Sequence, residues 1–282
     1  MGYRRPDLAG AWYPGGEREV RKTIERYIKE VSKPIDSYKG VGGIVPHAGW
    51  YFSGRTAFSV FYSIAEKRSP RLIWLFGMHL PPKGPDYIFI DDGYKTPLDT
   101  LPVHKEAVRM MNETFSFSQE DARSYTQDNT IEVQLPFVKY LFPEASIVTV
   151  GVSPSEHAVK VGERAAAITQ ELGESGCFIG STDLTHYGPN YAFTPHGTGK
   201  ESVQWVREKN DKEVVDLFLK ADWGGALRSA LSKQNACCPG AAVAAIAAVK
   251  KMGAEKGVLV QYTTSYDVHP DYSFVGYAGV VY

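Results

Sequence analysis

Apolar and polar residues alternate along the chain in two distinct patterns. Near the start, Val20, Ile24 and Ile28 recur at helical spacing among charged residues, which predicts an amphipathic helix. Runs such as RLIWLFG at 71–77 are instead apolar throughout, which predicts short strands buried on both faces. The two patterns follow one another repeatedly, so the sequence predicts strands that alternate with helices.

These patterns assign most of the chain. Beyond the first helix, helices are expected at 54–66, 103–113, 155–172, 201–220 and 239–252, with a further helix start at 128–133. Strands are expected at 41–45, 71–77, 87–91, 146–152, 177–181, 257–264 and 273–282. Such alternation is typical of an α/β fold. We therefore expect a single domain over residues 1–282, with a mostly parallel central sheet and helices on both faces.

Composition narrows the class of protein. Hydrophobic residues make up 43% of the chain, which suffices for a large core, and the formal net charge of -1 leaves no basic excess for nucleic acid. No apolar run reaches about 18 residues, so no membrane span is expected. The chain has only 3 cysteines, and its first segment lacks the apolar core of a signal peptide. We expect a cytoplasmic protein without a disulfide framework.

Three histidines stand out by their position. His47, His79 and His186 each come a few residues after an expected strand. The carboxyl ends of parallel strands meet at one edge of a sheet, and α/β proteins place their sites beyond that edge. These imidazoles are therefore candidates for a shared site.

Cys238 is the fourth candidate. It precedes Pro239, and proline is favoured in the first turn of a helix, so Cys238 is expected at or near a helix N-cap. The helix dipole there stabilises a thiolate. A thiolate beside neutral imidazoles suits iron, copper or zinc and suits magnesium or calcium poorly. We expect the adjacent Cys237 to pack in the core, because neighbouring side chains seldom face one site.

Each candidate also has a structural explanation. The histidines after the strands could bond only their own turns, and Cys238 could be an inert buried thiol. Asp183 and His186 lie three positions apart, so they could form a pair that supports the site or could cap a helix. The other histidines are expected on the surface, except that His269 lies in a late loop that could line a pocket.

Eight separated segments share the order of motifs in one known family. They are RRPDLAGAWYPGG, VPHAGWYFSG, FGMH, TPLDTLPVHKEAV, NTIEVQLPF, STDLTHYG, NACCPGAAVAAI and the closing YAGVVY. In this order they resemble the Memo family, also called the AmmeMemoRadiSam system protein B family, over essentially the full chain. The resemblance is specific for the family but not for an activity.

The resemblance implies a fold similar to that of class III extradiol dioxygenases, which are non-haem iron enzymes. In the family pocket, two histidines and one cysteine can hold copper or iron. By motif these fall on His47, His79 and Cys238. Cys238 is preferred because it lies three residues after Asn235, as in the N-x-x-C pattern of the family.

The resemblance also extends to the residues around that pocket. Asp183 and His186 match the SxDxxHxG segment and are the expected catalytic residues. Two positions depart from the family. Asn129 stands where a histidine is common, and an asparagine cannot shuttle protons. Met78 replaces a residue of the GPS or GPN turn. Asn129 could instead act as an N-cap paired with Glu132.

Three functions are consistent with this site. The first is a redox activity of dioxygenase type, dependent on Fe(II) or copper, acting on an unknown small substrate. The alternative is a non-enzymatic binding or scaffold protein that uses the same pocket for a peptide or small molecule. A zinc hydrolase or lyase is third, because two histidines and one cysteine with an open position also suit catalytic zinc.

Overall fold

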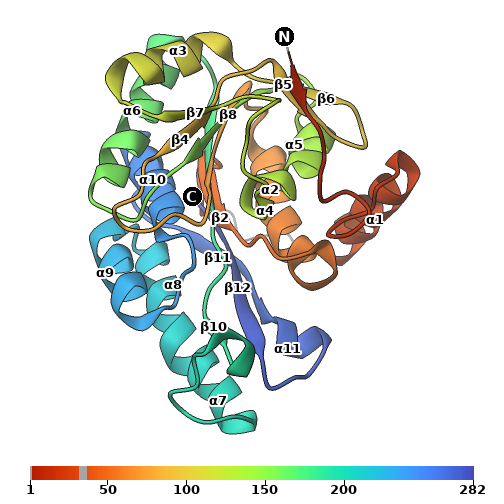
Figure 1. Cartoon of the computed structure of the whole chain (residues 1–282), viewed down its shortest axis with the longest axis vertical. Coiled ribbons are helices and arrows are strands. Elements are labelled where there is room, and N and C mark those ends of the chain that lie inside the picture. Colours follow the sequence, from red (N-terminus) through yellow and green to blue (C-terminus); the bar gives the residue numbers. More distant parts are fainter. Residues whose placement is uncertain (1, 32–36) are drawn as a thin grey trace.

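A nine-stranded sheet runs through the centre of the computed structural model, which describes residues 2–31 and 37–282 (Figure 1). Its strand order is β10-β12-β2-β9-β3-β8-β4-β7, and β11 pairs with β12 beside that path. The strands are β2 (Gly42–Val45), β3 (Leu72–Gly77), β4 (Tyr87–Phe89), β7 (Ser118–Glu120), β8 (Ser146–Gly151), β9 (Gly176–Ser181), β10 (His186–Tyr187), β11 (Val258–Thr264) and β12 (Phe274–Val281).

The four strands at the middle of the sheet are parallel. β9 lies between β2 and β3, and β3 also pairs with β8. Antiparallel pairs flank them on both sides, β12 with β2 and β4 with β8, so the sheet is mixed around the predicted parallel centre. Because β2, β3 and β9 run in one direction, the segments that follow them lie at the same edge of the sheet.

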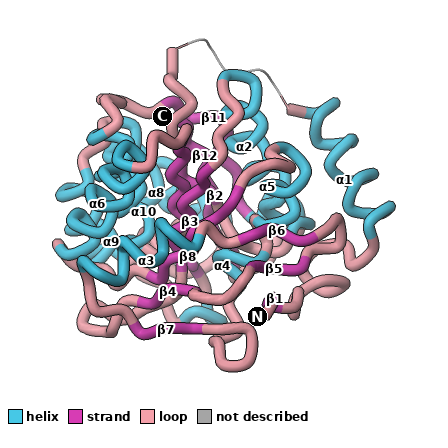
Figure 2. The backbone as a smooth tube through the Cα atoms, turned by 90° about the horizontal axis from the view of Figure 1, so that it is seen from above, coloured by secondary structure: helices cyan, strands magenta, loops and turns pink. Residues whose placement is uncertain are grey.

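Helices cover both faces of this sheet, as predicted. On one face, α10 (Pro239–Lys251) packs against β9, β3 and β2, and α6 (His157–Glu171) packs on α10. On the other face, α2 (Arg55–Lys67) packs against β12, β11 and β2, with α1 (Glu17–Glu30) and α5 (Leu135–Leu141) beside it. Figure 2 shows the two helical layers on either side of the strands. Among the described residues, no helix is both long and apolar enough to cross a bilayer.

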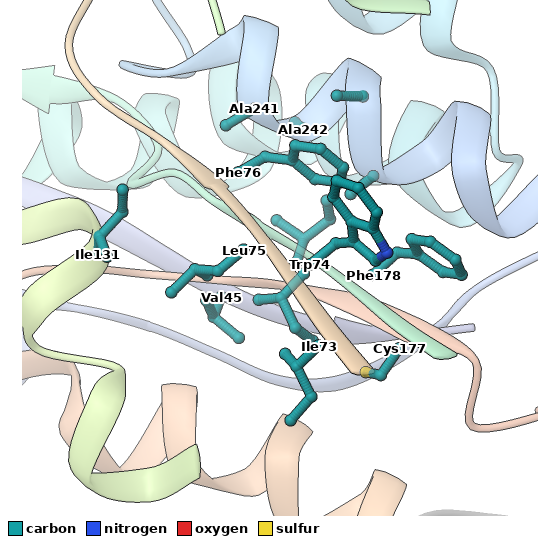
Figure 3. Close-up of a cluster of buried hydrophobic side chains, with 14 of the residues drawn as sticks. Val45, Ile73, Trp74, Leu75, Phe76, Ile131, Cys177, Phe178, Ala241 and Ala242 are labelled. Carbon is teal, nitrogen blue, oxygen red and sulfur yellow. The ribbon is translucent and has the colours of Figure 1, made fainter. Parts of the chain in front are cut away.

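The central strands supply the core from both of their faces. Along β3, Trp74 and Phe76 point toward α10, where Ala241 and Ala242 lie, while Ile73 points to the opposite side (Figure 3). All the side chains of β3 are fully buried. This explains the unbroken apolar run in the sequence, because a strand covered by helices on both faces has no polar side.

Close helix packing in this layer depends on small side chains. Residues Pro239 to Val249 of α10 are all buried, because α10 lies between the sheet and α6. A Cβ added at Gly162 of α6 would collide with the backbone of Ala244 in α10. The two helices therefore approach as closely as glycine permits.

We expect Gly162→Ala to lower the free energy of unfolding by about 1–3 kcal/mol, because the added methyl group meets backbone that cannot rotate away. The matched control is Gly224→Ala in α9 (Trp223–Lys233), where only a side-chain end lies near the added Cβ. That change should be neutral or stabilising by up to about 1 kcal/mol. Urea unfolding of both variants measures the difference, and equal effects would contradict the packing described.

The sequence pattern does not reveal several elements, most of which are short. They are the three-stranded sheet of β1 (Tyr3–Arg4), β5 (Gly93–Lys95) and β6 (Thr100–Pro102), the strands β7 and β10, and the helices α5, α9 and α11 (Ser265–Val268). The expected helix at 103–113 begins two residues later, as α3 (Lys105–Thr114), because the side chain of His104 accepts a hydrogen bond from the Ala107 N–H as its N-cap.

The helix expected at 201–220 is not regular. It comprises α7 (Lys200–Trp205), a π-helical turn over Val206–Asn210 and α8 (Asp211–Leu219). The side-chain amide of Asn210, at the end of the turn, donates to the Thr185 hydroxyl (2.9 Å) and to the Lys233 carbonyl (3.2 Å). The widened turn thus ties the helix to the segment that leads into β10.

Candidate metal centre

Two imidazoles and two thiols meet beyond the carboxyl ends of the central strands. His47 follows β2, His79 follows β3, and Cys237 and Cys238 directly precede α10. One ligand atom from each of these four residues lies within 4.8 Å of all the others. The structure therefore brings together the three residues predicted as ligands and adds Cys237.

The loop that carries His47 is held from three directions. The backbone N–H of His47 donates to the Asp183 carboxylate (2.7 Å), and the Asn129 amide donates to the His47 carbonyl (3.0 Å). The Gln134 amide donates to the carbonyl of Pro46 (2.7 Å). His47 is itself 1% exposed, so its ring position is fixed by its surroundings.

Hydrogen bonding also fixes which ring nitrogen of His47 is available. Its Nδ1 lies 3.1 Å from the Ser181 hydroxyl, and that hydroxyl donates its own proton to the Thr130 carbonyl (2.7 Å). The hydroxyl must therefore accept from Nδ1–H. Nε2 is left facing Cys237, whose sulfur is 3.2 Å away. Nδ1 therefore keeps its proton, and Nε2 is the nitrogen that can exchange its proton for a metal.

His79 is positioned by a strained turn. Met78 before it has φ 69°, a left-handed conformation that is costly for a long side chain. The Met78 N–H donates to the Thr130 hydroxyl (2.8 Å), and the Met78 side chain is buried. The His79 ring meets the His47 ring edge-on at 4.9 Å, and its Nδ1 lies 4.0 Å from the Asp128 carboxylate. The departure at Met78 thus directs His79 into the site.

Cys238 is the N-cap of α10, as predicted, but the expectation that Cys237 packs in the core is wrong. Cys238 is the more buried of the two, whereas Cys237 is half-buried, and the sulfurs lie 3.7 Å apart. Adjacent side chains diverge in regular strands and helices. The N-cap belongs to neither, and Cys238 has φ -126° there, so both thiols reach one site.

The charges of the site centre on His47 and Cys237. Burial alone would lower the pKa of His47, but the negative charges of Asp183 and Cys237 outweigh it and raise the pKa to about 9. Burial opposes ionisation of Cys237 too, yet the Cys238 thiol and the His47 charge hold its pKa well below the usual thiol value. Burial and the neighbouring sulfur raise the pKa of Cys238. In the metal-free protein the thiol that ionises more readily is thus Cys237, not the predicted Cys238.

This charge distribution predicts selective alkylation of the metal-free protein. We expect iodoacetamide to modify Cys237 before Cys238 and to lose less of its rate than an ordinary thiol between pH 8 and pH 6, because the pKa of Cys237 lies well below the usual thiol value. An ordinary thiol would slow about tenfold per pH unit over this range. Peptide mass spectrometry after timed quenching measures the order of labelling. Faster labelling of Cys238, or an ordinary thiol pH profile, would contradict the assignment, and Cys237→Ser is the control.

Asp183 and His186 occupy different places around the group. Asp183 is buried and bonds His47, with one oxygen 3.9 Å from Nε2, and burial raises its pKa. His186 is half-buried, and its Nδ1 lies 3.2 Å from the Leu184 carbonyl, which can only accept. The Nε2 of His186 is therefore the free acceptor, and its ring meets that of Tyr191 edge-on at 4.9 Å. Asp183 therefore supports His47, and within the described residues it makes no hydrogen bond or ion pair with His186.

The suggested capping pair of Asn129 and Glu132 is wrong. The N-cap of the short helix α4 (Asn129–Glu132) is Asp128, whose carboxylate accepts from the Ile131 N–H (3.2 Å). Glu132 instead accepts from the N–H of Leu8 (2.6 Å) and from a tyrosine hydroxyl. Asn129 is thereby free to hold the His47 carbonyl and to face the site.

Two cavities open on the group. The larger, of about 680 Å³, is lined by His47, His79, Asn129, Asp183 and His186, together with several aromatic residues and His269. The smaller, of about 430 Å³, is mostly apolar and reaches Cys237. His186 and Tyr191 line both. The ligand group is therefore accessible from its imidazole side and from its thiol side.

The donor set and its spacing fit a transition-metal ion. An ion that binds two sulfurs at about 2.3 Å in tetrahedral geometry holds them about 3.8 Å apart, and the two sulfurs here are separated by 3.7 Å. The His47 ring is already oriented for coordination, with Nδ1 held by Ser181 and Nε2 facing the Cys237 sulfur. Imidazole and thiolate donors favour iron, copper or zinc.

Comparisons with known proteins match the whole chain. A family model described as Memo-like protein matches residues 4–281. A MEMO1 family protein of Methanopyrus kandleri is 31% identical, over 99% of this chain and 98% of the relative. One of Thermococcus onnurineus is 29% identical over 99% of both chains. Another, of Methanosarcina acetivorans, is 31% identical over 100% of this chain and 99% of the relative.

Proposed function

This chain belongs to the Memo-like protein family, and from that premise we propose that it is an iron- or copper-binding protein with a redox activity of dioxygenase type on a small substrate. The resemblance read from the sequence motifs is thereby confirmed at the level of the family. The observation that carries the proposal is the convergence of His47, His79 and two cysteines, with the imidazoles lining one cavity and Cys237 lining another. The likeness to class III extradiol dioxygenases is part of the proposal.

His47, His79 and Cys238 would hold the metal, with Cys237 beside them as a further donor. Such a metal would supply Lewis-acid and one-electron redox chemistry, with open positions for dioxygen or for an oxygen-bearing substrate. Ser181 accepts from the Nδ1–H of His47, so Nε2 is the nitrogen left to bind a metal, and Asp183 holds the backbone of the same residue. These two contacts supply the orientation that a metal-binding histidine needs.

His186 is the residue best placed to move a proton in the cavity. Its Nδ1 is engaged with the Leu184 carbonyl, so a neutral ring offers Nε2 as a base toward the space that it lines. The histidine common elsewhere in the family is Asn129 here, so His186 is proposed to act without that second imidazole.

A structural or catalytic zinc site is the second candidate. Two thiols and two imidazoles form a complete tetrahedral donor set, and a site closed in that way binds zinc without leaving an open position. A phosphopeptide-binding function fits less well. None of the described residues that line the larger cavity is Lys or Arg, the side chains that recognise phosphate.

Metal analysis after anaerobic purification tests the proposal. We expect about one equivalent of iron or copper per chain, retained on dialysis, and oxygen uptake that depends on the metal when candidate substrates are added. One equivalent of zinc with no iron or copper would favour the second candidate. No metal above background at micromolar supply would refute both.

A further inference from the structure

We propose that the ligand of the larger cavity carries a cationic amine, held at the cavity mouth by Asp271 and by exposed aromatic rings. This inference rests on the proposed function, since it concerns what enters the space above the metal ligands. It specifies a chemical class that the ligand group alone does not select.

Exposed aromatic side chains gather around this cavity. Tyr51 is 73% exposed, Tyr191 42% and Trp12 40%, and all three line it. They come from three separate segments of the chain, so their convergence is not a consequence of sequence proximity. Large aromatic rings exposed together at a cavity mouth mark a surface that is covered when a ligand binds.

Apart from its imidazoles, the cavity is lined by charged residues of one sign. Asp183 lies inside it, Asp271 lies at the exposed mouth, and none of the described lining residues is Lys or Arg. The carboxylate of Asp271 accepts a hydrogen bond from the Tyr272 N–H (2.5 Å), which leaves its remaining acceptor positions free for a ligand. Arg207 lies in the π-helical turn Val206–Asn210. Its guanidinium donates to Asp267 and Thr264, and it does not line the cavity.

A bound metal ion would not make the mouth of the cavity positive. Two cysteine sulfurs lie in the ligand group, and coordinated thiolates offset the charge of a divalent ion. The carboxylate of Asp271 is therefore the charge that a ligand meets at the exposed mouth, where it attracts a cation and repels an anion. A cation also gains from the faces of Trp and Tyr rings, which carry partial negative charge. An ammonium group at the mouth can contact both the Asp271 carboxylate and the aromatic rings, while the rest of the ligand extends toward His47 and His79.

Three phenols of similar size and different charge test this. Tyramine is cationic, p-cresol is neutral and 4-hydroxyphenylacetate is anionic. Calorimetric titration of the full chain, with and without bound metal, measures the affinity for each. We expect tyramine to bind about tenfold more tightly than 4-hydroxyphenylacetate, with p-cresol between them.

Asp271→Asn is expected to weaken tyramine binding about five- to tenfold and to leave p-cresol binding unchanged. Glu255→Gln is the matched control. Glu255 is exposed and does not line the cavity, and its substitution removes the same charge from the chain as Asp271→Asn does. The control should bind all three phenols as the unchanged protein does.

The inference is overturned if the anion binds as tightly as the amine, if Asp271→Asn leaves tyramine affinity unchanged, or if none of the three binds at millimolar concentration. Metal content, measured on the same samples, separates this result from the proposed function. Amine preference without metal uptake would refute the metal centre alone. Metal uptake without amine preference would refute the amine site alone.

Discussion

His47→Ala is expected to lower the affinity for iron or copper by at least about 100-fold. Loss of a residue that merely supports a metal ligand costs about 10–100-fold, and His47 is itself a ligand in this account. Its Nε2 faces the sulfur of Cys237 at 3.2 Å, and its Nδ1 is held by Ser181. No other described side chain of the ligand group offers a nitrogen in that position. Competition with a chromophoric chelator under anaerobic conditions measures the change.

His269→Ala is the matched control, because His269 lines the same cavity but lies outside the ligand group. It should keep the affinity of the unchanged protein. Far-UV circular dichroism of both variants checks that each is folded, since the His47 ring is buried. Similar affinity in the two variants would show that His47 does not bind the metal.

Phe137→Ala is expected to lower the free energy of unfolding by about 3–5 kcal/mol. The Phe137 ring is fully buried and stacks on Trp50 at 4.1 Å with an interplanar angle of 8°. It also contacts the rings of Tyr27 and Phe58, so its removal leaves a cavity that several rigid neighbours cannot fill. Urea unfolding followed by tryptophan fluorescence measures the loss.

Phe137→Leu is the control for this change. Leucine keeps most of the volume, so the loss should stay below about 1.5 kcal/mol. The same cluster supports the segment that carries His47, because the Trp50 indole donates to the Val133 carbonyl (2.9 Å). We therefore expect the alanine variant to bind metal more weakly as well. A loss below about 1 kcal/mol for Phe137→Ala would contradict the packing of this cluster.

The sequence pattern predicted the centre of the fold well, for a physical reason. β3 and β9 are buried throughout and β8 after its first residue, so their apolar runs are unmistakable. Strands of two or three residues such as β1 and β10 leave no such pattern, because partners distant in the sequence define them. The π-helical turn at Val206–Asn210 is set by contacts of Asn210 with other segments, which periodicity does not report.

The site was predictable in part. His47 and His79 follow buried parallel strands. Because the carboxyl ends of such strands meet at one edge of the sheet, the sequence alone predicts that the two residues lie together. The participation of Cys237 was missed, because the argument from diverging neighbours does not apply at a helix N-cap. The role of Asp128 as the N-cap in place of Asn129 was missed as well. The Asp128–Asn129 pair offers two good caps, and only the contact of Asn129 with the His47 carbonyl decides between them.

X-ray absorption at the metal edge of the anaerobically loaded protein tests the central claim most directly. The account predicts sulfur scattering at about 2.3 Å together with imidazole nitrogen at about 2.0–2.1 Å. The sulfur contribution should fall in Cys238→Ser, and the imidazole contribution in His79→Ala. A shell of oxygen and nitrogen alone, with no sulfur, would contradict a metal centre built from His47, His79 and the cysteines before α10.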